Sequence, residues 1–203
     1  MLRVLSFALL AGVLTSPVVA QEPNLAALFE RGVSWETFVA GVKDRRELWT
    51  TNTRRAAPAE AMVARLKKAG AGLQILAIAE GACSDSVSTI PYLARLAAMA
   101  GVELRIVGRD AGKAVMEQHR TPDRRAATPT VVLMRHGKVA GVWVERPWAL
   151  QTWFLSDAAM GLTSDEKVAR KMAWYDWDRG DSTVAEIVAL AEKAGGTGDG
   201  RRR

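Results

Sequence analysis

The stretch between residues 73 and 107 limits the possible folds most strongly, because strand, helix and strand patterns follow one another within it. Residues 73–79, LQILAIA, are almost wholly apolar, which is typical of a strand covered on both faces. Residues 84–100 repeat apolar side chains at helical spacing, and residues 102–107 alternate as a strand does. A strand, helix and strand in this order predict a parallel, right-handed βαβ unit. We therefore expect an α/β protein.

The following segments predict a helix and a β-hairpin. Residues 110–120 have the pattern of a helix. Two strand patterns come next, at 130–134 and 138–145, on either side of Arg135-His136-Gly137. Because hairpin strands are antiparallel and the βαβ strands are parallel, the central sheet is expected to be mixed.

Helices are expected before and after this core. Thr163 with Glu166 and Thr183 with Glu186 fit two capping boxes, which would each open a C-terminal helix. The expected organisation is a signal peptide at 1–20, an N-terminal helical extension at 21–72, the core at 73–160, C-terminal helices at 161–194 and a disordered tail at 195–203. Five tryptophans are interpreted as core or helix-packing residues: Trp143, Trp148, Trp153, Trp174 and Trp177.

The first twenty residues have the pattern of a secretory signal peptide. Arg3 precedes an apolar run at 4–13, Pro17 breaks the run, and Ala20 fits the cleavage position. The run is too short for a comfortable transmembrane helix, and an uncleaved anchor is the alternative. We expect a mature chain exported to the periplasm or the extracellular space, without stable membrane insertion after cleavage.

Charge and cysteine content exclude several classes of protein. The formal net charge is +6, but the basic residues form separate pairs rather than a stripe with interleaved aromatics, so no nucleic-acid partner is expected. One cysteine and two histidines argue against an internal disulfide framework and against a zinc module. No metal and no cofactor are expected.

The single cysteine, Cys83, lies where a thiol is readily activated. It follows the first predicted strand and comes directly before the helix at 84–100. Functional groups in open α/β sheets gather at the carboxyl ends of strands. The unpaired N–H groups and the dipole at a helix start favour the thiolate over the thiol. The alternative is an inert, buried cysteine.

Around these residues the sequence resembles the thioredoxin superfamily, whose active site is a strand, a Trp-Cys-x-x-Cys motif and a long helix. This chain has Ala82-Cys83-Ser84-Asp85-Ser86, and Pro91 stands where that family's helix carries a proline. Thr128-Pro129-Thr130 matches the family's loop with a cis proline. The resemblance covers about residues 73–144. It implies a thioredoxin-like fold in which Thr128 and Pro129 lie beside the sulfur and bind an extended substrate.

Departures from the family pattern restrict the implied chemistry. Ser86 replaces the resolving cysteine, so Cys83 has no thiol partner within the motif. Ala77 stands where many thioredoxins bury an aspartate, and Ala82 where they carry the tryptophan. What remains is monothiol exchange, in which an outside thiol must release the mixed disulfide. The expected partners are protein or small-molecule thiols and disulfides.

Three side chains are candidate accessory residues. Glu80 ends the first strand and is a candidate proton acceptor, against the alternative of an exposed strand-end carboxylate. Arg124 and Arg125 lie with Arg120 before Pro129 and would attract a carboxylate-bearing thiol, against the alternative of solvated loop charges.

These observations favour an exported monothiol thiol–disulfide oxidoreductase or isomerase-like protein with Cys83 as nucleophile. Two alternatives stay open. One is a redox-inactive thioredoxin-like peptide-binding module or chaperone. The other is a degenerate relative in which only the helical extensions bind a partner.

Overall fold

The computed structural model of the protein describes residues 23–196, with side chains up to residue 195. The predicted signal peptide lies outside the described residues, as do residues 197–203 of the predicted tail. Residues 195 and 196 belong to the last helix, α10 (Asp181–Gly196), which is therefore longer than the sequence pattern predicted.

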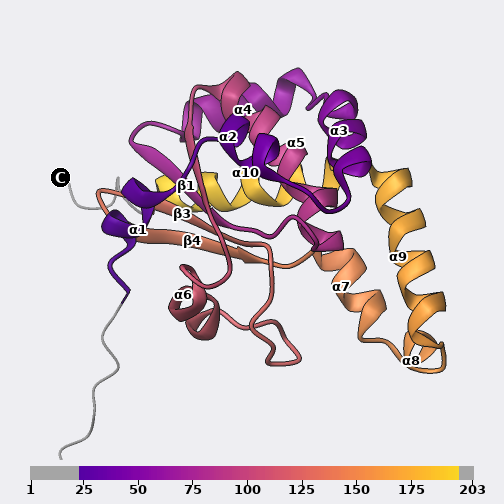
Figure 1. The fold of residues 1–203 in the computed structure, drawn as a ribbon. Coiled ribbons are helices and arrows are strands. Elements are labelled where there is room, and N and C mark those ends of the chain that lie inside the picture. Colours follow the sequence, from indigo (N-terminus) through magenta and orange to yellow (C-terminus); the bar gives the residue numbers. More distant parts are fainter. Residues whose placement is uncertain (1–22, 197–203) are drawn as a thin grey trace, which may run out of the picture.

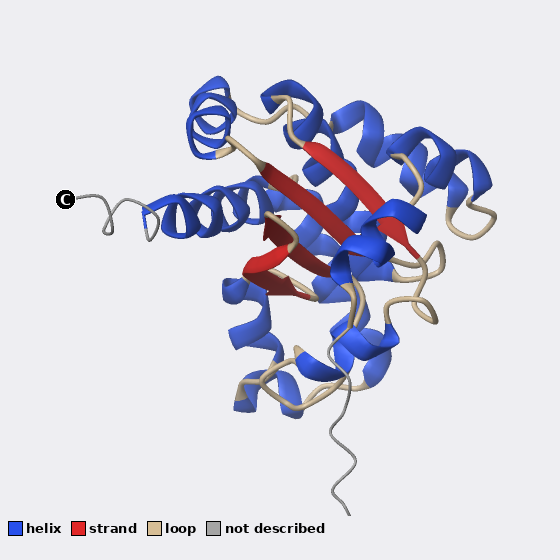
Figure 2. Cartoon of the chain, turned by 90° about the vertical axis from the view of Figure 1, so that its left-hand side faces the viewer, coloured by secondary structure: helices blue, strands red, loops and turns tan. Residues whose placement is uncertain are grey.

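A four-stranded sheet in the order β2-β1-β3-β4 forms the centre of the fold. The strands are β1 (Leu73–Ile78), β2 (Glu103–Val107), β3 (Thr130–Arg135) and β4 (Lys138–Val144). β1 pairs in parallel with β2 and antiparallel with β3, and β3 pairs antiparallel with β4. Helices lie on both sides of these strands (Figure 2). The mixed sheet with flanking helices confirms the predicted fold class.

One face of the sheet carries the larger part of the core. Leu73, Ile75 and Ala77 of β1 share one buried cluster with side chains of four helices. These helices are α3 (Arg46–Arg55), α4 (Glu60–Ala69), α5 (Ser84–Ala100) and α10. α5 is the crossover between the parallel strands β1 and β2, as the helical spacing of its apolar residues predicted.

The opposite face is covered by two short helices. Leu76 and Ile78 of β1 cluster there with side chains of α1 (Leu25–Arg31) and α6 (Lys113–Gln118). β1 is thus buried on both faces, which is why its sequence is an apolar run rather than an alternating pattern.

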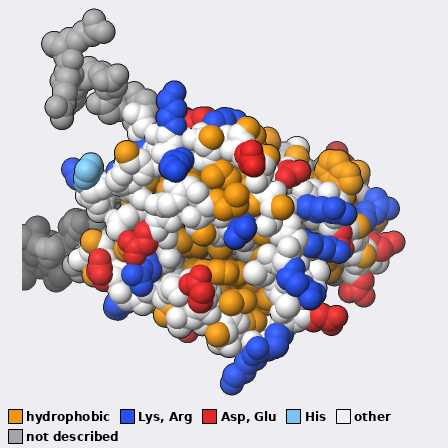
Figure 3. All heavy atoms as spheres, turned by 90° about the horizontal axis from the view of Figure 1, so that it is seen from above, with side chains coloured by type: hydrophobic (Ala, Val, Ile, Leu, Met, Phe, Trp, Pro, Cys, Tyr) orange, Lys and Arg blue, Asp and Glu red, His pale blue; other side chains and the backbone are white. Residues whose placement is uncertain are grey.

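The N-terminal helices are built into the core. A bridge between Val33 and Ile106 lies at the outer edge of β2, just before α2 (Trp35–Gly41). The Trp49 ring packs against the rings of Trp35 and Phe38, with centroids 6.0 and 5.4 Å apart. Figure 3 shows the face that carries α2, α3 and α4, where hydrophobic side chains gather toward the middle.

Three C-terminal helices form an arm at one end of the molecule, to the right in Figure 1. They are α7 (Trp148–Phe154), α8 (Asp157–Met160) and α9 (Ser164–Asp178). The capping box of Thr163 and Glu166 opens α9, as predicted. None of the helices in the described part of the chain is long and apolar enough to cross a membrane.

The second predicted capping box is wrong. α10 begins at Asp181, so Thr183 lies inside the first turn and its side chain is buried. The Glu186 carboxylate instead accepts hydrogen bonds from the Trp143 indole and the Trp148 backbone N–H, both at 2.7 Å. Glu186 therefore binds residues distant in sequence instead of capping its own helix.

The interpretation of the tryptophans is correct for Trp143, which is buried, and wrong for two others. Trp148 is 67% exposed and Trp177 is 76% exposed. The Trp177 ring packs edge-on against Trp174, with centroids 6.3 Å apart, so the two rings contact each other outside the core.

Candidate active site

Cys83 lies after β1 and caps the N-terminus of α5. Its Sγ accepts the backbone N–H of Ser86 at 3.4 Å, where a capping oxygen normally stands. On its other side the thiol donates to the carbonyl oxygen of Thr128, with Sγ and O 3.2 Å apart. Cys83 is partly exposed. The sulfur therefore lies between a helix start and the Thr128–Pro129 turn, in a residue that is partly exposed to solvent.

Strand pairing brings Thr128 and Pro129 to the sulfur. β3 pairs with β1 so that Thr130 lies opposite Ile78, and both the turn and the thiol therefore fall at the same end of these two strands. The Thr128–Pro129 peptide bond is cis, as the resemblance implied. Pro91 lies inside α5 and is buried.

Ser86 closes the turn that carries Cys83. Its side chain is fully buried, and its Oγ accepts the backbone N–H of Glu80 at 3.4 Å. The residue at the resolving position thus fixes the loop. The Glu80 carboxylate is 3.1 Å from Arg109 in an ion pair at the surface, and its role as proton acceptor stays a prediction.

The N-terminal extension holds the same loop from the other side. The indole Nε1 of Trp49 donates to the carbonyl oxygen of Gly81 at 2.9 Å, and Nε of Arg45 donates to that of Ala82 at 2.8 Å. The acceptors, Gly81 and Ala82, are the two residues that precede Cys83. The extension therefore contributes to positioning the thiol.

A buried carboxylate, Asp85, lies in the first turn of α5, two residues after the cysteine. Lys171 Nζ is 2.7 Å from one of its oxygens, and the Tyr175 hydroxyl donates to the other at 2.8 Å. All three residues are about 5% exposed. Burial, followed by the nearby Asp85 charge, raises the pKa of Tyr175 well above its usual value, so the phenol stays protonated and donates.

Further ion pairs connect this carboxylate to the loop before Pro129. Arg146 Nε is 3.5 Å from Asp85, and the same guanidinium is 2.5 Å from Glu145. Arg125 donates to both Glu145 oxygens at 2.9 Å and also pairs with Asp123. Opposite charges therefore alternate from α5 to the loop that carries the Thr128–Pro129 turn.

Two of the three arginines in the loop before Pro129 are held by contacts within the protein. Arg125 is occupied by two carboxylates, and Arg120 pairs with Glu117 and donates to the backbone of Arg124. Arg124 is exposed and has a positive φ of 65°. Attraction of a carboxylate-bearing thiol stays a prediction for this loop.

Sequence reasoning missed the residues that support the site. Nothing in the sequence indicated that Trp49 and Arg45 bind the cysteine loop, because no local pattern links them to a loop more than thirty positions away. Lys171 and Tyr175 gave a weak signal: they are four residues apart and so share a face of one helix. Asp85 also gave a weak signal, because it is a charged residue two positions after Cys83, at the start of a mostly apolar helix.

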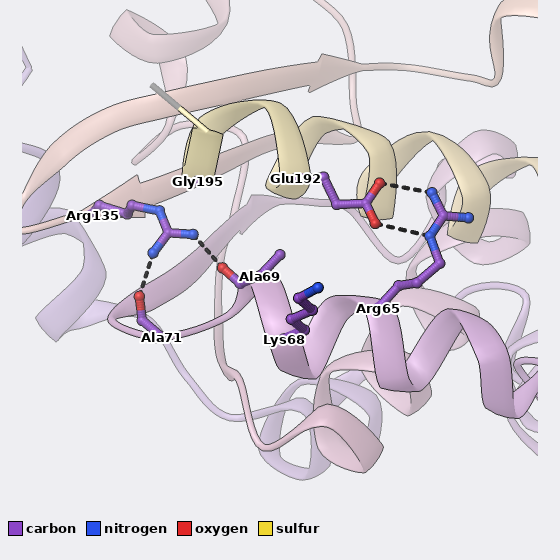
Figure 4. A pocket seen from close by; sticks show the side chains of 7 residues that line it. All are labelled: Arg65, Lys68, Ala69, Ala71, Arg135, Glu192 and Gly195. Atoms are coloured by element: carbon purple, nitrogen blue, oxygen red, sulfur yellow. Dashed lines mark hydrogen bonds and ion pairs between the residues drawn. The ribbon is translucent and has the colours of Figure 1, made fainter. Parts of the chain in front are cut away.

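Of two surface pockets, one lies beside the cysteine loop and the other lies far from it. One of about 580 Å³ lies beside the cysteine loop and is lined by Ala82, Glu80 and Arg109, among others. The other, of about 400 Å³, lies between α4, the end of α10 and Arg135, which donates to the carbonyl groups of Ala69 and Ala71 (Figure 4). It is at the opposite end of β1 from Cys83, because Arg135 pairs with Leu73.

Within residues 23–196, no group of three or more His, Cys, Asp or Glu side chains is placed to hold a metal ion.

Together, a mixed β2-β1-β3-β4 sheet, a cysteine at the start of the crossover helix and a cis proline turn beside it define a thioredoxin-like protein. The family model described as thioredoxin matches residues 32–165, about two thirds of the sequence. The chain belongs to the thioredoxin family. Helix α9 beyond its first turn and helix α10 lie outside the matched range.

Two solved structures are similar in fold. A protein of unknown function from Pseudomonas aeruginosa is 18% identical, with a TM-score of 0.66 over 85% of this chain and 99% of its own. An HIV epitope scaffold is 19% identical, with a TM-score of 0.64 over 84% of this chain and 98% of its own. No curated protein matches the sequence.

Proposed function

We propose that the protein is an exported monothiol thiol–disulfide exchange protein that acts through Cys83. The observation that carries the proposal is the position of Sγ, which accepts the Ser86 N–H and lies 3.2 Å from the Thr128 carbonyl oxygen. Membership of the thioredoxin family and partial exposure of the cysteine support it. Export rests on the signal-peptide pattern of the sequence alone.

The proposed reaction is an exchange without net oxidation. The Cys83 thiolate attacks one sulfur of a disulfide R–S–S–R′, forming Cys83–S–S–R and releasing R′–S⁻, which takes up a proton. An outside thiolate R″–S⁻ then attacks the R sulfur of the mixed disulfide. It releases the Cys83 thiolate and forms R–S–S–R″.

The residues of the site support both steps. The helix N-terminus and the Ser86 N–H stabilise negative charge on the departing or attacking Cys83 sulfur. The backbone around Thr128 is the proposed pairing edge for an extended substrate. Ser86 carries no thiol, so release needs the second, outside thiol.

The test uses the mature chain, residues 21–203, with hydroxyethyl disulfide. Intact mass spectrometry is expected to show one adduct, on Cys83, that excess glutathione removes. Cys83→Ser should form no adduct. A wild-type protein that forms no adduct over hours at pH 8 while folded would contradict the proposal and favour a redox-inactive binding module.

A further inference from the structure

The cysteine is followed by two residues that share one buried cation. Lys171 Nζ is 2.8 Å from Ser84 Oγ and 2.7 Å from Asp85 Oδ2. Ser84 and Asp85 are the first two residues of α5, and Ser86, the third, directs its N–H at the sulfur. One ammonium group therefore fixes the turn that presents this N–H to Cys83.

The cation comes from outside the region that matches the family. Lys171 lies on α9, and the family match ends at residue 165. α9 is itself held in place, by Tyr175 on Asp85 and by an ion pair of Asp176 with Arg55 of α3 at 3.0 Å. The contact between Lys171 and the first turn of α5 therefore joins a helix outside the matched range to the cysteine site.

The charge of Asp85 makes the contact important for the thiol. A carboxylate two residues from the sulfur opposes the thiolate unless cations balance it. Lys171 is its short-range partner, because Arg146 is farther, at 3.5 Å, and is also bound to Glu145 at 2.5 Å. Other charges contact the loop more peripherally: Arg45 on the Ala82 carbonyl, and Glu80 paired with Arg109.

We propose that Lys171 is a positioning residue for Cys83, which balances the Asp85 carboxylate and fixes the first turn of α5 around the reacting sulfur. The inference rests on the proposed function only in taking Cys83 as the reacting group.

The test is the rate of Cys83 alkylation by iodoacetamide, an uncharged reagent, at pH 7. Lys171→Met should slow alkylation about five- to tenfold, because the buried Asp85 carboxylate, two residues after Cys83 in the sequence, is left with weaker compensation. Arg170→Met, which removes a charge from the adjacent exposed position of α9, should leave the rate unchanged within about twofold.

Two further variants separate charge balance from simple loss of structure. The double variant Asp85→Asn/Lys171→Met removes both charges and should restore the rate to within about twofold of wild type. Asp85→Asn alone keeps the cation and should react at least as fast as wild type, which tests the proposal even if Lys171→Met does not fold. Urea unfolding identifies the folded variants.

The inference is overturned if folded Lys171→Met alkylates at the wild-type rate, or if folded Asp85→Asn alkylates more slowly than wild type. Alkylation needs no disulfide substrate. A wild-type protein that is inert toward hydroxyethyl disulfide but shows the expected order of alkylation rates would contradict the proposed function and support the role of Lys171.

Discussion

The Trp49 indole donates a 2.9 Å hydrogen bond to the carbonyl oxygen of Gly81, joining helix α3 to the loop that leads into Cys83. Trp49 is almost wholly buried and packs against other aromatic rings of the N-terminal extension. The conformation of the cysteine loop therefore depends on a segment that precedes the central sheet.

Trp49→Phe should lower the free energy of unfolding by about 2 kcal/mol, because the Gly81 carbonyl loses its donor and the smaller ring leaves a cavity. Urea unfolding measures the change. Trp35→Phe alters a half-buried ring of the same cluster and should cost about half as much or less. Equal losses for the two variants would argue against a special role for the Gly81 contact.

Ser86→Cys should turn the monothiol site into one that releases its own adduct. The introduced thiol attacks Cys83–S–S–R at Cys83 and releases R–SH, closing an internal disulfide. Release without added thiol should be at least about tenfold faster than from wild type, because the attack becomes intramolecular. Loss of the adduct is followed by mass spectrometry.

Ser88→Cys is the matched control for that experiment, since it adds a thiol to the same helix two residues farther from Cys83. It should release its adduct no faster than wild type. Equal behaviour of the two variants would contradict the assignment of position 86 as the resolving position.

Arg125→Gln should lower the free energy of unfolding by about 1–2 kcal/mol at pH 7, because the buried Glu145 loses its bidentate hydrogen bonds to Arg125. The hydrogen bond from Arg125 lowers the pKa of Asp123 below its usual value. A lowered carboxyl pKa stabilises the folded protein above the unfolded pKa of about 4 and loses this effect as the pH falls through the folded value.

The difference between wild type and Arg125→Gln should therefore shrink between pH 7 and pH 3 in urea unfolding. Arg124→Gln removes the neighbouring exposed arginine and should change stability little at either pH. A difference that stays constant down to pH 3 would show that these ion pairs do not contribute to the acid dependence.

Thr183→Val should raise the free energy of unfolding by about 0.5–1 kcal/mol. The Thr183 hydroxyl is buried and has no hydrogen-bond partner among the described residues, so an apolar group of the same shape removes a desolvation penalty. Thr163→Val, at a real N-cap, should instead lower stability by about 1 kcal/mol. A loss of stability in Thr183→Val as well would contradict the argument that the buried hydroxyl is unpaired and destabilising.

The sequence by itself determined the βαβ-hairpin order, the extent of α5 and the position of Cys83 at its start, because these follow from local apolar periodicity and helix-start chemistry. It also indicated the approach of Thr128 and Pro129 to the sulfur, through the resemblance. Only the tertiary structure decided what surrounds the thiol. Trp49, Arg45, Glu145, Arg146 and Lys171 reach the site from segments far apart in sequence, and Thr183 was misread because a local capping pattern holds no information about burial. Periodicity shows which face of an element is apolar, but which polar groups meet beneath it depends on how the elements pack.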